Sequence, residues 1–87
     1  MGHATTAAPA PDGDEIDLAE WGRRLRARRK QRGLLQAELA DAIHTTQDTI
    51  SRFERGTRAP NDRQRVALAR ALKTSIWSLF PYPGDVG

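Results

Sequence analysis

The sequence predicts a small all-α domain, and three features carry this prediction. Apolar residues recur at helical spacing, residues able to cap helices precede several of these stretches, and glycine or proline ends them. The clearest stretch is residues 36–56, QAELADAIHTTQDTISRFERG, which predicts two short helices joined by a tight turn. Short helices linked by three or four residues cross steeply, as in a helix-turn-helix unit.

Length and composition bound the possible classes of protein. The chain has 87 residues and no cysteine, which allows one small domain and excludes disulfides and thiolate chemistry. This cysteine usage suits a reducing cytoplasm, where we expect the protein to act at the nucleoid. Residues 1–20 lack a basic start and an apolar run, so no secretory signal is expected. No apolar stretch approaches the roughly 18 residues that span a bilayer.

Charge is divided unevenly along the chain. Residues 1–20 hold five acidic residues and neither lysine nor arginine. The remaining residues hold 14 basic and six acidic side chains, a net charge of +8. This density suits a polyanion such as nucleic acid, although many basic domains bind none. Residues 1–14, rich in Ala, Pro, Thr and Gly, predict a disordered tail whose acidity aids solubility or weakly occupies the basic surface.

The expected domain covers residues 15–82, with the helix-turn-helix motif at 36–55 and a second tail at 83–87. The first helix is expected to begin near residues 14–17 and to end at Gly33. Its predicted buried stripe is Leu18, Trp21 and Leu25. The basic run RARRKQR at 26–32 is either a solvated face or a surface that attracts phosphates.

The helices of the motif have recognisable caps and inner faces. The second helix is predicted at residues 36–42, with inner residues Leu39, Ala40 and Ile43. Thr46 is the predicted N-cap of the third helix. That helix is expected to bury Ile50 and Phe53 and to stop at Gly56.

Two further helices are predicted after the motif. Asn61 caps a helix over residues 62–72, and Ser75 caps a short helix over residues 76–80 before the prolines end regular structure. The predicted inner face of the longer helix is Val66, Leu68, Ala69 and Leu72. Three aromatic residues near the end are either partial core or a homodimer contact: Trp77, Phe80 and Tyr82.

The predicted outward side of the third helix carries the functional hypothesis. Its members have short or planar hydrogen-bonding heads: Gln47, Asp48, Thr49, Ser51 and Arg52. Gln pairs with adenine, Asp accepts from cytosine N4, and Arg forks onto guanine, all in the major groove. The pattern is typical of a recognition helix, and the alternative is a solvated polar face.

Between Trp21 and Phe80 the sequence contains the motifs RLRARRKQRGL, QAELADAI, TTQDTISRFERG, RAP and LARALKTSIWSLF. In these motifs the stretch resembles the Cro/repressor (C1-type, XRE) helix-turn-helix family, which implies a five-helix fold like that of lambdoid phage repressors. It implies base reading by Gln47, Asp48 and Arg52, with Thr49 and Ser51 contributing. It also implies a structural ion pair between Arg29 and Glu54. The expected phosphate contacts are Gln36, Thr46, Arg26, Arg28, Lys30, Arg55, Thr57 and Arg58.

Three residues depart from the family pattern. Leu35 stands where a capping Ser, Thr or Asn is common, and its lost cap costs on the order of 1 kcal/mol. His44 stands where Gly is usual, which matters if its φ is positive. Arg28 stands where Leu is frequent, so we expect a phosphate contact in place of a core contact.

An enzyme is the rival class of protein, and the sequence argues against it. His3 and His44 lie in a predicted tail and a predicted turn, without a metal-ligand cluster, a phosphate loop or a paired nucleophile and base. No cofactor is therefore expected. The predicted function is a sequence-specific transcriptional repressor that binds a palindromic double-stranded operator as a homodimer. The alternative is an antitoxin- or coactivator-like module that holds a protein partner with the same fold.

Overall fold

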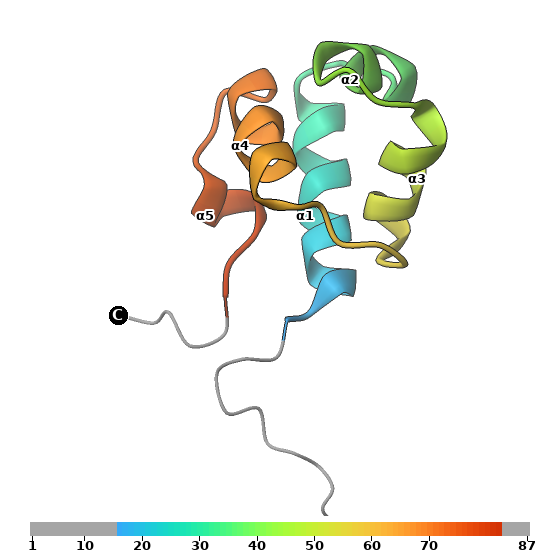
Figure 1. Ribbon diagram of the computed structural model, residues 1–87. Coiled ribbons are helices and arrows are strands. Elements are labelled where there is room, and N and C mark those ends of the chain that lie inside the picture. Colours follow the sequence, from blue (N-terminus) through green and yellow to red (C-terminus); the bar gives the residue numbers. More distant parts are fainter. Residues whose placement is uncertain (1–15, 83–87) are drawn as a thin grey trace, which may run out of the picture.

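The computed structural model describes residues 16–82, and all regular structure in that range is helical. Figure 1 shows the five helices in chain order: α1 (Leu18–Gln31), α2 (Gln36–Ala42), α3 (Gln47–Arg55), α4 (Asp62–Ala71) and α5 (Ile76–Leu79). The predicted five-helix all-α fold is confirmed. The predicted tails at 1–14 and 83–87 lie outside the described residues.

Side-chain caps set where four of the helices begin. In each case the capping side chain accepts a hydrogen bond from the backbone N–H three residues later, which satisfies one of the free donors of the first turn. The caps of α1, α3, α4 and α5 are Asp17, Thr46, Asn61 and Ser75. The ends of α1 and α3 are also set by neighbouring residues, because Gly33 and Gly56 adopt left-handed φ values of +73° and +75° just after these helices.

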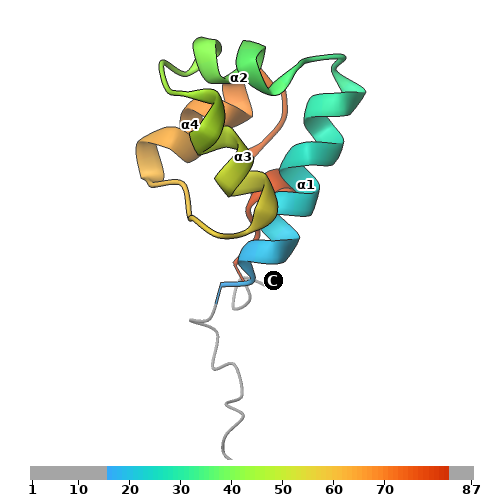
Figure 2. The same cartoon turned by 90° about the vertical axis from the view of Figure 1, so that its right-hand side faces the viewer.

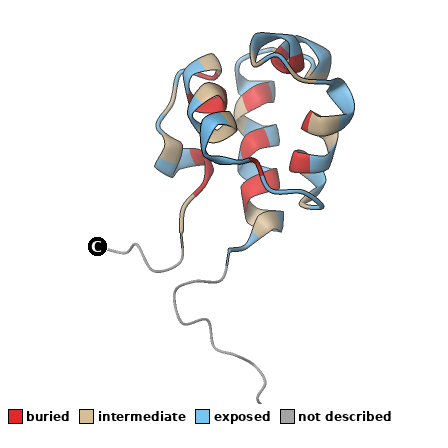
Figure 3. Cartoon of the chain, in the orientation of Figure 1, coloured by how far each residue is buried: buried red, intermediate tan, exposed pale blue. Residues whose placement is uncertain are grey.

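The core forms where the inner faces of all five helices meet around α1, as the buried positions in Figure 3 show. Its members are Trp21, Leu25, Leu39, Ala40, Ile50, Phe53, Leu68, Ala69, Leu72, Leu79 and Phe80. All the core residues that α1, α2 and α3 contribute belong to the buried stripes predicted for these helices. Their outer members Leu18 and Ile43 are partly buried and pack against it.

The inner face of α4 differs from the prediction at one position. Val66 is 39% exposed, so its assignment to the core is wrong. From the helical rotation per residue, Val66 points about 140° away from the centre of the stripe that Leu68 and Leu72 form. Arg65 occupies the inner position instead, with its guanidinium 5.6 Å from the ring centroids of both Trp21 and Tyr82.

α1 and α3 approach each other closely at Gly22. A β-carbon at this position would lie 2.2 Å from the backbone oxygen of Glu54. Glycine is therefore required here for steric reasons, and the backbones of the two helices are in direct contact. This packing fixes α3 against the longest helix of the domain.

The turn between α2 and α3 contains His44 with φ +59°. Its N–H donates to the Asp41 carbonyl, and the next N–H, of Thr45, donates to the Ala40 carbonyl. The left-handed conformation lets the chain leave α2 and enter α3 within a few residues. None of the helices in the described range is long and apolar enough to span a membrane.

Candidate nucleic-acid interface

The outward side of α3 combines a firm anchor with exposed polar side chains. Ile50 and Phe53 are buried in the core, so the helix cannot rotate freely. Asp48 and Arg52 are exposed on the opposite side, and Gln47 is exposed in the first turn of the helix. Figure 2 shows α3 in front, between α1 and the start of α4, with α2 above it. The helix is thus the most prominent element of this face of the domain.

The hydroxyl groups of α3 are largely occupied within the helix. Thr46 Oγ1 accepts from the Thr49 N–H and lies 3.0 Å from Thr49 Oγ1. The Ser51 hydroxyl accepts from Nη1 of Arg55. Thr49 and Ser51 are half-buried. The amide and charged heads of the exposed residues therefore hold most of the free hydrogen-bonding capacity of this surface.

A chain of side-chain hydrogen bonds joins the starts of α2 and α3. Gln47 Nε2 donates to Gln36 Oε1 at 3.4 Å, and Gln36 Nε2 donates to Glu54 Oε1 at 3.0 Å. Gln36 and Gln47 are thus neighbours in space although eleven residues separate them in the sequence. The arrangement presents two amide groups side by side at the N-terminal ends of both helices.

The ion pair implied by the family resemblance is present beneath this surface. Arg29 Nε lies 2.6 Å from Glu54 Oε2, and Arg29 Nη2 donates to Glu54 Oε1 at 3.1 Å. Arg29 Nη1 also donates to the Leu34 carbonyl at 2.7 Å. Both side chains are buried, and hydrogen bonding to Glu54 raises the pKa of Arg29 above its ordinary value. The pair ties α3 to α1.

The start of α2 has only half of a capping interaction. Leu35 is the N-cap residue, and its side chain has no atom that accepts a hydrogen bond. The Glu38 carboxylate provides the reverse half, because it accepts from the Leu35 N–H at 2.8 Å. The Leu35 side chain is 66% exposed beside Gln36.

Basic side chains surround α3 on two sides. On α1, Gly22 and Arg29 face α3, and Arg26 shares their side of the helix because it is four residues from one and three from the other. Lys30 follows Arg26 by one turn. At the end of α3 and in the loop after it, Arg55 and Arg58 are exposed.

Sequence reasoning missed one basic residue of this region. Arg63 lies in the first turn of α4, directly after the loop that follows α3, and its side chain is exposed. The sequence could have indicated Arg63, because it is a basic residue at the start of a predicted helix and the loop before that helix was already predicted to contact phosphates.

Arg28 is engaged elsewhere, which corrects its predicted role. Its Nε donates to the Leu72 carbonyl at 2.9 Å and its Nη2 donates to the Lys73 carbonyl at 2.7 Å. These carbonyls belong to the two residues that follow α4, where a cation also interacts favourably with the helix dipole. Arg28 therefore holds α1 to α4, on a side of α1 different from the side that faces α3.

The three aromatic residues predicted as partial core or a dimer contact differ in their exposure. Phe80 is 1% exposed and packs edge-on against Trp21 at a centroid distance of 5.1 Å. It belongs to the core, so its assignment to a dimer contact is wrong. Tyr82 is half-buried between Trp21 and Trp77. Trp77 is 57% exposed and is the large aromatic side chain that this end of the described chain presents to solvent.

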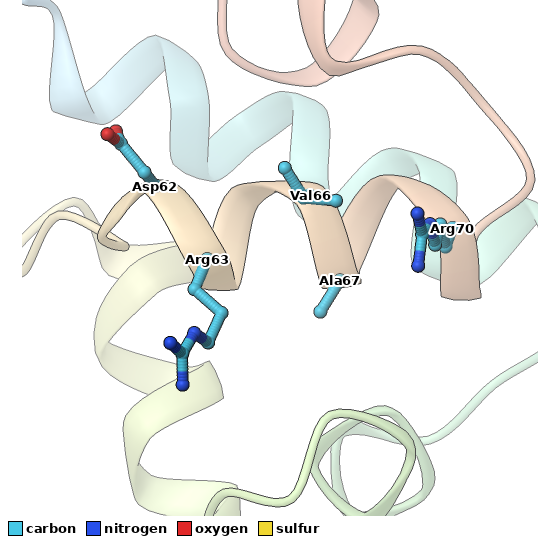
Figure 4. A pocket seen from close by; sticks show the side chains of 5 residues that line it. All are labelled: Asp62, Arg63, Val66, Ala67 and Arg70. Carbon is cyan, nitrogen blue, oxygen red and sulfur yellow. The ribbon is translucent and has the colours of Figure 1, made fainter.

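A surface hollow of about 420 Å³ lies along α4. Its lining residues, drawn in Figure 4, are Asp62, Arg63, Val66, Ala67 and Arg70. All of them come from one helix, so the hollow does not surround a ligand as a substrate pocket does. The described residues include no group of three or more His, Cys, Asp or Glu that could hold a metal ion.

Comparison with known proteins identifies the family. The helix-turn-helix family model matches residues 25–76. The restriction-modification controller protein C.AhdI from Aeromonas hydrophila is 34% identical over 74% of this chain and 97% of that chain, with a TM-score of 0.70. The P22 c2 repressor, solved in complex with a synthetic operator, is 37% identical over 75% of this chain and 96% of that chain, with a TM-score of 0.67.

One similar structure is not a small regulator. HppE is 30% identical over 72% of this chain, but the match covers 37% of the HppE chain and therefore does not extend to that whole protein. No match was found among curated protein sequences. The family model and the two small relatives agree with the helix-turn-helix fold of this chain. This chain belongs to the Cro/repressor (XRE) type of helix-turn-helix proteins, a family of DNA-binding transcriptional regulators.

Proposed function

We propose that this protein is a sequence-specific transcriptional repressor that binds a palindromic double-stranded operator as a homodimer, without catalysis and without a cofactor. The observation that carries the proposal is the construction of α3. Gln47, Asp48 and Arg52 project outward from a helix that Ile50 and Phe53 lock into the core. A rigid helix with exposed polar heads suits insertion into the major groove.

Specificity and affinity are assigned to different residues in this proposal. Side chains of α3 read the base edges, and the hydrogen bond that Gln47 donates to Gln36 helps to hold the Gln47 amide in place. The phosphate contacts are Gln36, Thr46, Arg26, Lys30, Arg55, Thr57 and Arg58, with Arg63 added and Arg28 removed. Neutralised phosphates release counterions, so this second set supplies affinity that decreases steeply with salt.

The homodimer part of the proposal rests on the exposed aromatic end of the chain. Trp77 is the main candidate contact, with Tyr82 beside it at a centroid distance of 6.0 Å. A two-fold dimer presents two α3 helices to half-sites about 34–36 Å apart on one side of the duplex. The P22 c2 repressor, a relative by sequence and structure, was solved on operator DNA, which agrees with this mode of binding.

The test is selection of bound sequences from a random pool of duplexes. We expect enrichment of palindromes, and we expect Gln47→Ala to weaken operator binding by about 1–3 kcal/mol with relaxed choice at one position per half-site. Gln31→Ala is the matched control, because this glutamine contacts Arg28 on the α4 side of α1. A pool that shows no enrichment, or equal loss on operator and random DNA, would contradict the proposal.

The exposed Trp77 also supports a second candidate, an antitoxin- or coactivator-like module that binds a protein partner through this end of the chain. Trp77→Ala separates the two candidates. Loss of dimerisation and of operator affinity favours the repressor. A natural chain that is monomeric and enriches no sequence favours the interaction module.

A further inference from the structure

The ion pair between Asp48 and Arg52 has no role in folding that the structure reveals. Arg52 Nε donates to Asp48 Oδ2 at 2.8 Å, and both side chains are more than half exposed. An exposed pair of this kind adds little to stability. A carboxylate on a surface that approaches a polyanion also weakens the general attraction. The presence of Asp48 at this position therefore calls for a specific function.

The geometry of the pair leaves the two terminal nitrogen groups of the Arg52 guanidinium free. Asp48 occupies Nε, while neither Nη1 nor Nη2 of Arg52 makes a hydrogen bond to any residue in the range 16–82. Those two groups form the fork that matches O6 and N7 of guanine. The contact to Asp48 thus restrains the guanidinium without using the donors that read the base.

Restraint matters because ordering a long side chain weakens binding. An unrestrained arginine that becomes fixed in an interface lowers affinity by roughly 2- to 12-fold, and a side chain held beforehand loses less. The carboxylate also offsets the charge of Arg52, which reduces the pull of nearby phosphates on its guanidinium. Both effects favour the base edge over the backbone as the target of Arg52.

We propose that Asp48 is a positioning residue that makes Arg52 a reader of guanine at one position of each half-site. This inference rests on the proposed function, since it assumes that α3 enters the major groove. It replaces the simpler assignment in which Asp48 itself accepts a hydrogen bond from cytosine. The two assignments predict different results when Asp48 is changed. If Asp48 positions Arg52, the preference weakens at the guanine that Arg52 reads, whereas direct contact with cytosine would weaken the preference at another position.

The experiment is selection from random duplexes with five proteins: the natural chain, Asp48→Ala, Asp48→Asn, Arg52→Ala and the double variant. The natural chain should select guanine at one position per half-site. Arg52→Ala should lose roughly 5- to 150-fold of that preference. Asp48→Ala should lose roughly 2- to 12-fold at the same position. The double variant should match Arg52→Ala, and Asp48→Asn should lie between Asp48→Ala and the natural chain because its amide oxygen still accepts from Nε.

Asp41→Ala is the matched control, because it removes one exposed negative charge from α2. Both Asp→Ala variants should bind random DNA somewhat more tightly, but Asp41→Ala should keep the full guanine preference. An Asp48→Ala variant that relaxes a different position, or whose loss adds to that of Arg52→Ala, would overturn the inference and leave the proposed function intact. A natural chain that enriches no sequence would overturn both.

Discussion

A β-carbon on Gly22 would fall 2.2 Å from the backbone oxygen of Glu54, while the Glu54 side chain accepts two hydrogen bonds from Arg29. One residue of α3 thus meets α1 through its backbone and through its carboxylate. These contacts lie directly behind the outward side of α3. They fix the direction in which Gln47, Asp48 and Arg52 project, which links the stability of the fold to the proposed reading of DNA.

Gly22→Ala is expected to destabilise the protein by about 1–3 kcal/mol or more, because the new methyl group must push two helix backbones apart. Urea unfolding measures the change. Gly33→Ala is the control: its β-carbon would meet nothing within 4 Å, and its φ of +73° alone should cost about 1–2 kcal/mol. Reduced operator binding by folded Gly22→Ala would show that helix separation also tilts α3. No loss of stability would contradict the close approach.

Glu54→Ala should lower the free energy of unfolding by about 3–5 kcal/mol, since it leaves the Arg29 charge buried without its partner. Glu20→Ala breaks an exposed contact to Arg23 and Arg24 and should change that free energy far less, because solvent screens exposed ion pairs. Chemical unfolding of both variants provides the comparison. Similar small losses would mean that the buried pair is not structurally important.

His44→Gly should stabilise the protein by up to about 1.5 kcal/mol. Glycine removes the strain of φ +59°, which is about 1–2 kcal/mol, but increases the entropy of the unfolded chain by an equivalent of about 0.4–1 kcal/mol. Thermal unfolding reports the difference. His44→Ala keeps the strained conformation and should give no gain, so a gain from alanine would remove the backbone explanation.

Leu35→Ser should stabilise α2 by about 1 kcal/mol, because a serine hydroxyl supplies the missing half of the capping interaction. The leucine side chain is mostly exposed, so little core packing is lost. Leu35→Ala is the control without a cap acceptor. Equal melting temperatures for the serine and alanine variants would argue against capping as the limiting factor.

Arg58→Ala and Arg28→Ala should separate DNA contact from scaffold. Arg58→Ala should weaken binding to all duplexes and reduce the salt dependence of log K by about one unit. Arg28→Ala removes hydrogen bonds to the end of α4, so it should lower stability and leave the salt slope unchanged. The measurement is binding across a salt series. A smaller salt slope for Arg28→Ala and an unchanged slope for Arg58→Ala would show that Arg28 contacts phosphate and that Arg58 does not.

The helices were predictable because their signals are local. Thr46, Asn61 and Ser75 each cap the helix that directly follows, and Trp21 and Leu25 lie one turn apart on one face. The exposed positions of Asp48 and Arg52 follow from the same periodicity, because Ile50 and Phe53 occupy the other side of α3. These properties depend on neighbours within about four residues, whose geometry the helix itself sets.

Contacts between distant segments could be decided only by the tertiary structure. The sequence determined by itself that the domain is helical, where its helices start, and which side of α3 is polar. The fold decided that Arg65 and not Val66 lies inward, that Phe80 is core, and that Arg28 reaches the end of α4. The reason is physical: a long side chain or an aromatic ring takes its role from whatever surface lies across from it, and that surface comes from residues dozens of positions away.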